Sequence, residues 1–168
     1  MTFDPPPIDF AFHQRILRFL HGEAQLLDDG KWTEWLNLFA ADGVYWIPSR
    51  PGQTDTRGVP SIIHEDRPLL AMRIERLAHP RAYAALPAPR TIHLVANIDL
   101  DGHDPATDEW RVSSQLLVVE HQAERTRLFA GHCQHVLRRA DGAFKIALKR
   151  VDLIDCDGVH DKPISFLL

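Results

Sequence analysis

Residues 90–98, RTIHLVANI, decide the fold, because the hydrophobic pattern of the chain changes its period there. Side chains two positions apart in a strand point to the same face of a sheet. One face of this stretch comprises Ile92, Leu94, Ala96 and Ile98, and the other comprises Thr91, His93, Val95 and Asn97. The alternation predicts a β-strand, whereas the segment before it has the three- and four-residue spacing of helices.

The segment 9–79 is predicted to be mainly helical, with one short strand. A first helix carries an apolar stripe at helical spacing, formed by Ile16, Leu20, Ala24 and Leu27. Asp9 is placed to cap its start, and Asp28, Asp29 and Gly30 end it. Glycine suits this end because it readily adopts the left-handed backbone conformation.

The next elements are shorter. A second helix is predicted from the spacing of Trp32, Trp35, Leu36 and Phe39. A short strand at 45–47 ends at Pro48, and residues 49–60 are predicted to form a surface loop because they contain two glycines and two prolines. A third helix begins near Pro68, with its buried stripe at Leu70, Ile74 and Leu77. Prolines 80, 87 and 89 predict an irregular segment after it.

Long antiparallel strands are predicted over residues 90–156. Asp104 and Pro105 mark a turn, and further strands follow around 110–118 and 128–139. Asp141-Gly142 is a strong hairpin signal, because both residues tolerate positive φ. In the last strand the apolar residues change from even to odd positions, which predicts a β-bulge near Lys149–Arg150 and a strongly curved sheet.

The order of elements therefore predicts an α+β fold, with the helices packed on one face of the sheet. We expect a single domain over residues 1–168, with an extended N-terminal arm at 1–8, which holds Pro5 to Pro7, and a C-terminal tail at 157–168.

The composition limits the classes of function. The net charge of −4 argues against a dedicated nucleic-acid-binding protein, which needs a basic face. No apolar run is long enough to span a bilayer, and the N-terminus has no secretory signal pattern. With only two cysteines, which we expect to be free thiols, these observations favour the cytoplasm.

Two Cys/His pairs approach the spacing of a Rieske cluster, which two cysteines and two histidines hold. They are Cys133-x-His135 and Cys156-x3-His160. Cys133 lies inside a strand rather than at a loop tip, and the second pair is one residue too long. We interpret Cys133 as a small core residue and His135 as a residue on a strand surface. Since His132 and His135 lie on opposite faces of a regular strand, they cannot chelate one iron ion together.

Several blocks of sequence resemble the small (beta) subunit of aromatic-ring-hydroxylating dioxygenases. The first lies at 23–48 and includes WLNLF (35–39) and YWIP (45–48). The second combines DR (66–67), LL (69–70) and Arg73 with RT (90–91), HLV (93–95) and Asn97. The third combines FAG (129–131) with VLRR (136–139), and ISFLL (164–168) is similar to the apolar end of the family. Together these blocks cover nearly the whole chain in the expected order.

This resemblance implies a cone-shaped fold similar to nuclear transport factor 2 (NTF2-like) and a non-catalytic, structural role. The partner would be a large alpha subunit, with three alpha and three beta chains in the complex and the beta chains associated as a trimer. The alpha subunit would carry the Rieske [2Fe-2S] cluster and a mononuclear Fe(II), and this chain would carry no cofactor. The complete enzyme would use O2 and electrons from NADH to convert an arene to a cis-dihydrodiol.

Six residues are candidates for contacts with neighbouring subunits: Tyr45, Trp46, Arg73, Arg90, His93 and Asn97. One of the adjacent aromatics, Tyr45 or Trp46, should point outward. Arginine suits forked contacts to carboxylates, although Arg73 and Arg76 fit a solvated helix face equally well, so Arg90 is the stronger candidate. The sequence departs from the family at Ile92 (often arginine), Ala96 (often serine) and His132-Cys133 (often a charged pair), which affects particular contacts rather than the fold.

Two other functions stay open, because one fold carries many activities. The first is a stand-alone isomerase or dehydratase, similar to ketosteroid isomerase or SnoaL, with a small-molecule pocket in the cone. Its pocket candidates are Asp28, Tyr45, His93 and His132, of which Asp28 could instead serve the helix end and His93 a structural hydrogen bond. The second is a binding module or oligomer without an alpha subunit.

Overall fold

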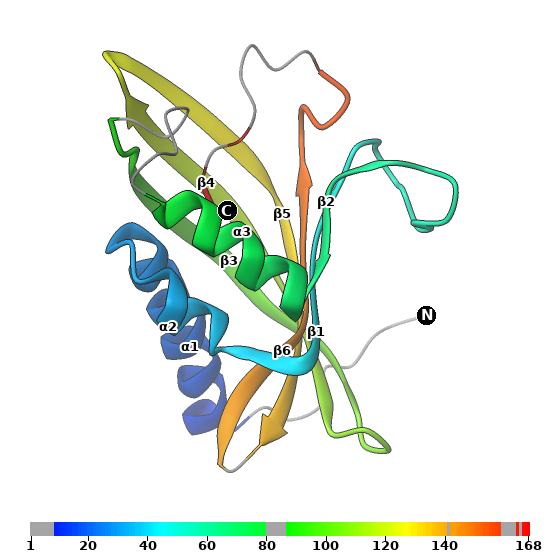
Figure 1. Ribbon diagram of the computed structural model, residues 1–168. Helices are drawn as coiled ribbons and strands as arrows, with labels where there is room; N and C mark the ends of the chain where they lie inside the picture. Colours follow the sequence, from blue (N-terminus) through cyan, green and yellow to red (C-terminus); the bar gives the residue numbers. More distant parts are fainter. Residues whose placement is uncertain (1–8, 80–86, 141, 159–163, 165) are drawn as a thin grey trace.

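The computed structural model describes residues 9–79, 87–140, 142–158, 164 and 166–168. Three helices and six strands follow one another in the order α1 (Phe10–Asp28), α2 (Trp32–Leu36), β1 (Phe39–Pro48), β2 (Ser61–Asp66), α3 (Arg67–Ala78), β3 (Arg90–Asp104), β4 (Glu109–Gln122), β5 (Arg125–Ala140) and β6 (Ala143–Leu153). Figure 1 shows the three helices together on one side of a strongly curved sheet. The expected α+β arrangement is confirmed. The expected 1–8 arm and half of the 157–168 tail lie outside the described residues.

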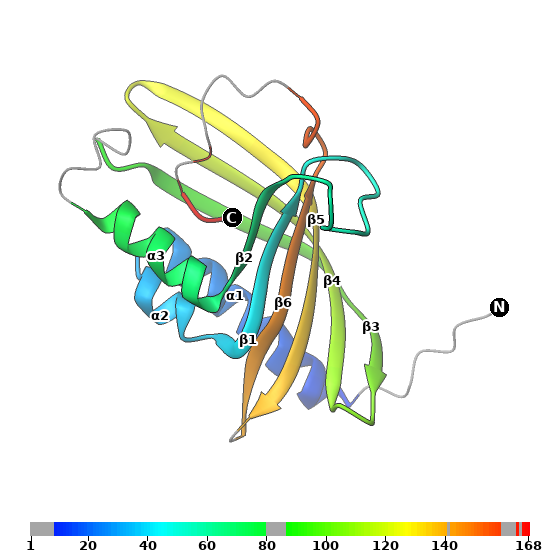
Figure 2. The same cartoon turned by 45° about the vertical axis from the view of Figure 1, so that its right-hand side comes forward.

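The sheet has the strand order β2-β1-β6-β5-β4-β3. All neighbouring strands are antiparallel except β1 and β6, which are parallel. The long strands β3 to β6 curl around the helices, as the turned view in Figure 2 shows, so the concave face encloses the core. The result is a cone whose inner wall is the sheet and whose cover is α1, α2 and α3.

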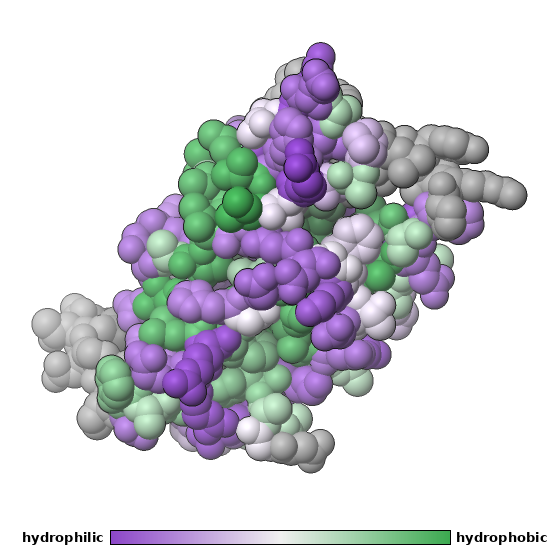
Figure 3. Space-filling view, turned by 90° about the vertical axis from the view of Figure 1, so that its left-hand side faces the viewer, coloured by the Kyte–Doolittle hydropathy of each residue, from purple (hydrophilic) through white to green (hydrophobic). Residues whose placement is uncertain are grey.

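The first helix forms as its sequence pattern predicts. Asp9 caps it by accepting a hydrogen bond from the Ala11 N–H at 3.1 Å, and Gly30 follows it with a φ of 67°. Its apolar stripe, Ile16, Leu20, Ala24 and Leu27, is buried against the sheet. Seen from the side of α1 in Figure 1, the surface mixes hydrophilic and hydrophobic residues (Figure 3).

Two early elements differ from the prediction. The second helix ends at Leu36, where the Leu38 N–H donates to the Trp35 carbonyl oxygen in a turn. The strand β1 begins at Phe39, because the Ile146 N–H of β6 donates to the Leu38 carbonyl oxygen. Phe39 still packs beside Trp35, so the helical spacing of these aromatics is also satisfied across the helix–strand junction. The strand β2 was not predicted, since its sequence, SIIHED, contains only two apolar residues.

Bulges also move residues between faces. In β6 the extra residue is Ala147, because Leu137 pairs with Ile146 and Val136 with Leu148. The predicted bulge near Lys149–Arg150 is therefore misplaced by about two residues, and Lys149 faces the core. In β3 a register shift between Ala96 and Asp99 turns Ile98 toward the core, so Ile98 does not share a face with Ile92.

The outer face of the sheet carries two apolar rows across β3, β4 and β5. Ile92 pairs with Val119 and Val119 with Leu128; likewise Leu94 pairs with Leu117 and Leu117 with Ala130. Four of these side chains are exposed large hydrophobic groups, namely Ile92, Leu94, Leu117 and Leu128, and Ile154 lies beside them. The alternation at 90–98 thus places an apolar stripe on the convex face and His93 on the inner one.

Candidate functional site

The cone interior contains a buried charged cluster formed by α1, β5 and β6. Glu23 accepts hydrogen bonds at Oε1 from Lys149 Nζ at 2.7 Å and from Trp35 Nε1 at 3.0 Å. His135 Nε2 lies 3.0 Å from Glu23 Oε2 and donates to it, since a carboxylate only accepts. The side chains of Glu23, His135 and Lys149 are each 4% exposed or less.

Glu23 and Lys149 form a buried ion pair within this cluster. Burial by itself would raise the pKa of Glu23, but the nearby Lys149 and His135, through their charge and their hydrogen bonds, hold that pKa well below its ordinary value. The carboxylate is therefore ionised and has three donors around it. Lys149 Nζ also lies over the Trp35 ring, 5.6 Å from its centroid.

A second polar group joins the end of α1 to β3 and to the C-terminal residues. Asp28 accepts from the His93 backbone N–H at 3.1 Å and from Thr91 Oγ1 at 3.2 Å. His93 Nδ1 lies 2.6 Å from Asp28 Oδ1, and His93 Nε2 lies 3.0 Å from the Leu167 carbonyl oxygen. Burial lowers the pKa of His93, while Asp28 opposes this effect.

The two contacts of the His93 ring require different tautomers. The Leu167 carbonyl only accepts, so His93 must donate Nε2–H to make that hydrogen bond. Donation to Asp28 requires the hydrogen on Nδ1 instead. A neutral imidazole therefore donates in one of the two contacts at a time.

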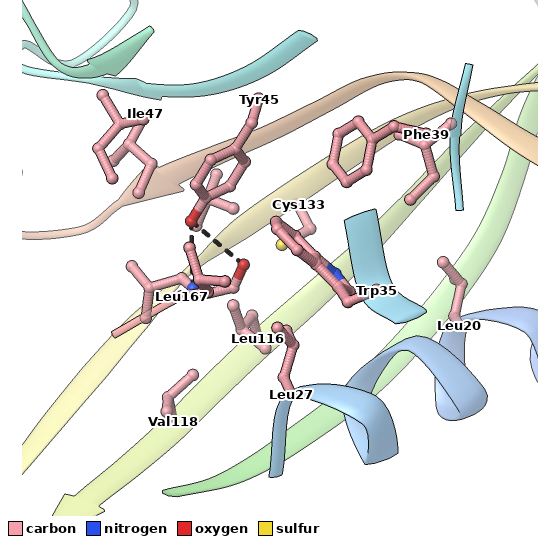
Figure 4. Close-up of a cluster of buried hydrophobic side chains, with 14 of the residues drawn as sticks. Leu20, Leu27, Trp35, Phe39, Tyr45, Ile47, Leu116, Val118, Cys133 and Leu167 are labelled. Atoms are coloured by element: carbon pink, nitrogen blue, oxygen red, sulfur yellow. Dashed lines mark hydrogen bonds between the residues drawn. The ribbon is translucent and has the colours of Figure 1, made fainter. Parts of the chain in front are cut away.

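Tyr45 completes the inner group. Its hydroxyl donates to the backbone oxygen of Leu168 at 3.2 Å and accepts from the Leu168 N–H at 3.1 Å. Burial raises the pKa of Tyr45, which keeps the phenol protonated. Figure 4 shows the tail residue Leu167 among the core side chains Leu27, Trp35, Leu116 and Cys133, with the Tyr45 hydroxyl directed at the tail.

A small cavity of about 10 Å³ lies between the two polar groups. Its wall includes His93, Ser114, Cys133, His135 and Lys149. Two buried polar atoms on this wall, Ser114 Oγ and His135 Nδ1, have no hydrogen-bond partner among the described residues. A cavity of this size holds about one water molecule and has no room for a larger ligand.

The structure brings together three of the four predicted pocket residues. Asp28, Tyr45 and His93 all contact the interior or the tail that fills it. Asp28 binds β3 rather than serving only its own helix end. His132, by contrast, is exposed on the outer face of β5, because neighbouring residues of a strand alternate and Cys133 faces inward.

The candidate contact residues have different exposures. Tyr45 and Trp46 are both buried, against the expectation that one would point outward; Trp46 donates to Ser61 Oγ at 3.0 Å and lies under the Arg150 guanidinium. His93 is also buried. Arg73 makes a forked contact with Glu65 of its own chain. Arg90 and Asn97 are exposed on β3, and Asn97 has a φ of 49° at the bulge.

Sequence reasoning missed the charged cluster. Cys133 is buried as expected, but His135 is also buried rather than on a strand surface. Glu23 lies one residue before Ala24 of the apolar stripe, and Lys149 follows the bulge, so its face depended on the position of the extra residue. Among the described residues, no group of three or more His, Cys, Asp and Glu side chains is arranged to hold a metal ion.

The outer apolar rows border a groove of about 460 Å³. It is lined by Leu94, Ala96, Leu117, Ala130 and Ile154, together with Gln115 and His132. Monomeric proteins rarely expose contiguous apolar areas of this kind without a binding role. Within the described part of the chain, no helix combines the length and apolar character that a membrane span requires.

The helices and the curved sheet form a cone of the NTF2-like type, with a filled interior and an apolar stripe on its outer face. Comparison with known proteins identifies the family to which this cone belongs. Residues 22–157 match the model of the family described as ring hydroxylating beta subunit. The chain belongs to this family, and the resemblance noted from the sequence is confirmed.

Individual relatives agree with this assignment. The chain is 30% identical to the biphenyl 2,3-dioxygenase subunit beta of Rhodococcus jostii RHA1, over 96% of this chain and 91% of that protein. The crystal structure of the benzoate 1,2-dioxygenase beta subunit from Burkholderia mallei has a TM-score of 0.72 and 28% identity, and the match covers 95% of this chain and all of that one. A naphthalene 1,2-dioxygenase structure, at 19% identity, shares the fold with a TM-score of 0.84, over 99% of this chain and 89% of that one.

Proposed function

We propose that this chain is the non-catalytic, structural beta subunit of an aromatic-ring-hydroxylating dioxygenase in the cytoplasm. It associates as a trimer and carries three large alpha subunits, in an alpha3beta3 complex. The alpha subunits hold the Rieske [2Fe-2S] cluster and the mononuclear Fe(II). There O2 and electrons derived from NADH convert an arene to a cis-dihydrodiol.

The proposal rests on an apolar stripe on the convex face of the sheet, in a chain that belongs to the beta-subunit family. Ile92, Leu94, Leu117 and Leu128 are exposed in two adjacent rows of the sheet. Burying such side chains stabilises an interface by about 25 cal/mol for each Å² of apolar surface removed from water. The stripe therefore favours association through this face, which is how we place the contact between beta chains.

The remaining candidate contacts fit around this stripe. Arg90 lies at the start of β3, exposed and close in sequence to Ile92, and Asn97 lies beyond Ala96 at the edge of the groove. We assign both to the rim of a subunit interface. Arg73, Tyr45, Trp46 and His93 have partners inside the chain, and their role is to hold the elements that carry the surface.

The interior supports a structural role. The Glu23 carboxylate and the Lys149 ammonium neutralise each other, with His135 hydrogen-bonded to the carboxylate, and the Asp28–His93 pair is bonded to the chain's own tail. A stand-alone isomerase would need open space beside its acid or base, and the cavity of about 10 Å³ does not provide it.

The test is co-purification with two variants of matched exposure. Leu94 on the outer stripe is 53% exposed, and Leu69 on α3 is 48% exposed. We expect the wild-type chain, purified by affinity tag from its own cells, to bring down a large iron-containing subunit in a complex with three beta chains. Leu94→Glu should abolish the trimer in size-exclusion chromatography with light scattering, while Leu69→Glu should leave it intact. A trimer that survives Leu94→Glu, or iron bound by this chain alone, would contradict the proposal.

A further inference from the structure

One histidine lies within the apolar groove on the convex face of the sheet. His132 is exposed on β5, with Ala130 two residues before it on the same face and Gln115 opposite it on β4. The other residues that line the groove are Leu94, Ala96, Leu116, Leu117, Gly131 and Ile154, and Asp155 is not among them. In this described lining, His132 is the single side chain whose charge can change between pH 5 and 8.

The charged groups that neighbour His132 in the sheet are paired with each other. Its register partner on β6 is Asp152, whose carboxylate accepts two hydrogen bonds from Arg150, both at 2.6 Å. On the side of β4, Gln115 is uncharged, and its side-chain oxygen accepts from Asn97 at 2.7 Å. The carboxylate nearest to His132 by register is therefore committed to Arg150, so a protonated His132 would lack a free counter-charge in the groove.

A second copy of the chain that covers the groove would change the environment of His132. Removing a charged side chain from water is costly unless an opposite charge compensates it. A neutral imidazole is covered at much lower cost, because it needs only hydrogen-bond partners. Assembly through the groove thus favours the neutral form of His132, and the protonated form favours separate chains.

We propose that protonation of His132 weakens the association of beta chains through the convex face, so that assembly of the trimer depends on pH. This inference rests on the proposed contact between beta chains and adds a regulation to that contact. In mild acid each chain must release one proton from His132 before its groove is covered. By linkage, each proton released changes the association constant up to about tenfold for each pH unit.

The direction of this effect is opposite to that of the overall charge. The chain has a formal net charge of −4 at pH 7 when its 10 histidines are neutral. As the pH falls, protonation of the histidines brings the net charge toward zero, which lowers the repulsion between copies and favours association. A trimer that weakens in mild acid therefore indicates a local cost at the interface and not an effect of the overall charge.

The experiment measures the association of the full-length chain by sedimentation velocity at pH 7.5 and at pH 5.5, in about 0.3 M salt to screen long-range repulsion. We expect the wild-type chain to be trimeric at pH 7.5, and the concentration for half assembly to rise about tenfold or more at pH 5.5. His132→Gln, which is neutral at both pH values, should assemble equally well at both. His132→Lys, which is charged at both, should associate at pH 7.5 as weakly as the wild-type chain does at pH 5.5.

The matched control is His21→Gln, which removes an exposed histidine of α1 on the helix side of the sheet. This variant should keep the full pH dependence of the wild-type chain. Circular dichroism at pH 5.5 checks that the chain remains folded, as we expect, because the contribution of Glu23 to stability is lost only below its ordinary pKa of 4.5.

The possible failures of this inference and of the proposed function are distinguishable. A wild-type trimer that is equally stable at both pH values, or more stable at pH 5.5, would overturn the inference and leave the subunit role intact. An unchanged pH dependence in His132→Gln would do the same, because it would assign the effect to another group. A chain that is monomeric at both pH values would overturn the proposed trimer as well.

Discussion

The buried cluster of Glu23, His135 and Lys149 gives the sharpest quantitative prediction. Lys149→Met removes the cation that stabilises the buried carboxylate while keeping the volume of the side chain. Removal of one partner from a buried ion pair typically destabilises a protein by about 3–5 kcal/mol, because the other charge is left uncompensated. For a chain of this length we expect the midpoint of thermal unfolding to fall by about 10 °C.

The matched change on the other side is Glu23→Gln, which leaves the Lys149 ammonium buried without its counter-ion. Each single variant should be destabilised, but the double variant should recover most of the loss. The introduced glutamine would keep an acceptor for Trp35 and offer an amide N–H to His135, and the introduced methionine would carry no charge. We expect a coupling free energy of about 2 kcal/mol or more in the double-mutant cycle.

The assay is thermal and urea unfolding followed by circular dichroism across pH. Because the folded-state pKa of Glu23 lies below its ordinary value of 4.5, its contribution to stability is present above that pH and is lost as the pH falls below it. This loss should be smaller in the double variant, which has no carboxylate there. Two results would refute a stabilising buried pair. One is a double variant no more stable than the less stable single variant, and the other is the same loss of stability at low pH in the double variant as in the wild-type protein.

Two further predictions concern β5. Gly131→Ala should destabilise the protein by about 2 kcal/mol, since the added Cβ would lie 2.5 Å from the Asp152 carbonyl oxygen. The control, Gly22→Ala at an exposed position of α1, should stabilise the protein by about 0.5–1 kcal/mol. Urea unfolding measures both changes, and equal effects would contradict the close approach at Gly131. Burial raises the pKa of the Cys133 thiol to about 12, so iodoacetamide at pH 8 should leave Cys133 unmodified in the folded protein. In guanidinium the same reagent should alkylate Cys133, as measured by peptide mass spectrometry. Rapid labelling of the native protein would show that β5 opens.

Much of this fold follows from local patterns, and its errors have identifiable causes. The stripe of α1, its Asp9 cap and the alternation in β4 depend on near neighbours in sequence, so periodicity predicts them. β2 is a strand because β1 offers its edge, which no pattern within Ser61–Asp66 indicates. The extra residue at Ala147 is also set by the partner strand, through the pairing of Val136 and Leu137.

The candidate site was predicted in part for the same reason. Asp28 and His93 form a hydrogen-bonded pair and Tyr45 bonds to Leu168, whereas His132 faces outward. The group of Glu23, His135 and Lys149 could not be found, because it needs α1, β5 and the bulged β6 in register at once. The apolar face of 90–98 would ordinarily be assigned to the core, and only the three-dimensional arrangement shows it on the convex surface.

The parallel junction between β1 and β6 has a consequence for how the chain reaches its native state. Val44 pairs with Leu148, so this contact closes a loop of about a hundred residues. The antiparallel hairpins of β3 to β6 can assemble early from nearby segments, but the two halves of the sheet join only after that long closure. Domains dominated by such distant contacts fold in milliseconds to seconds, so we expect refolding of this chain to be slow and its β1 segment to be the last to gain protection from hydrogen exchange.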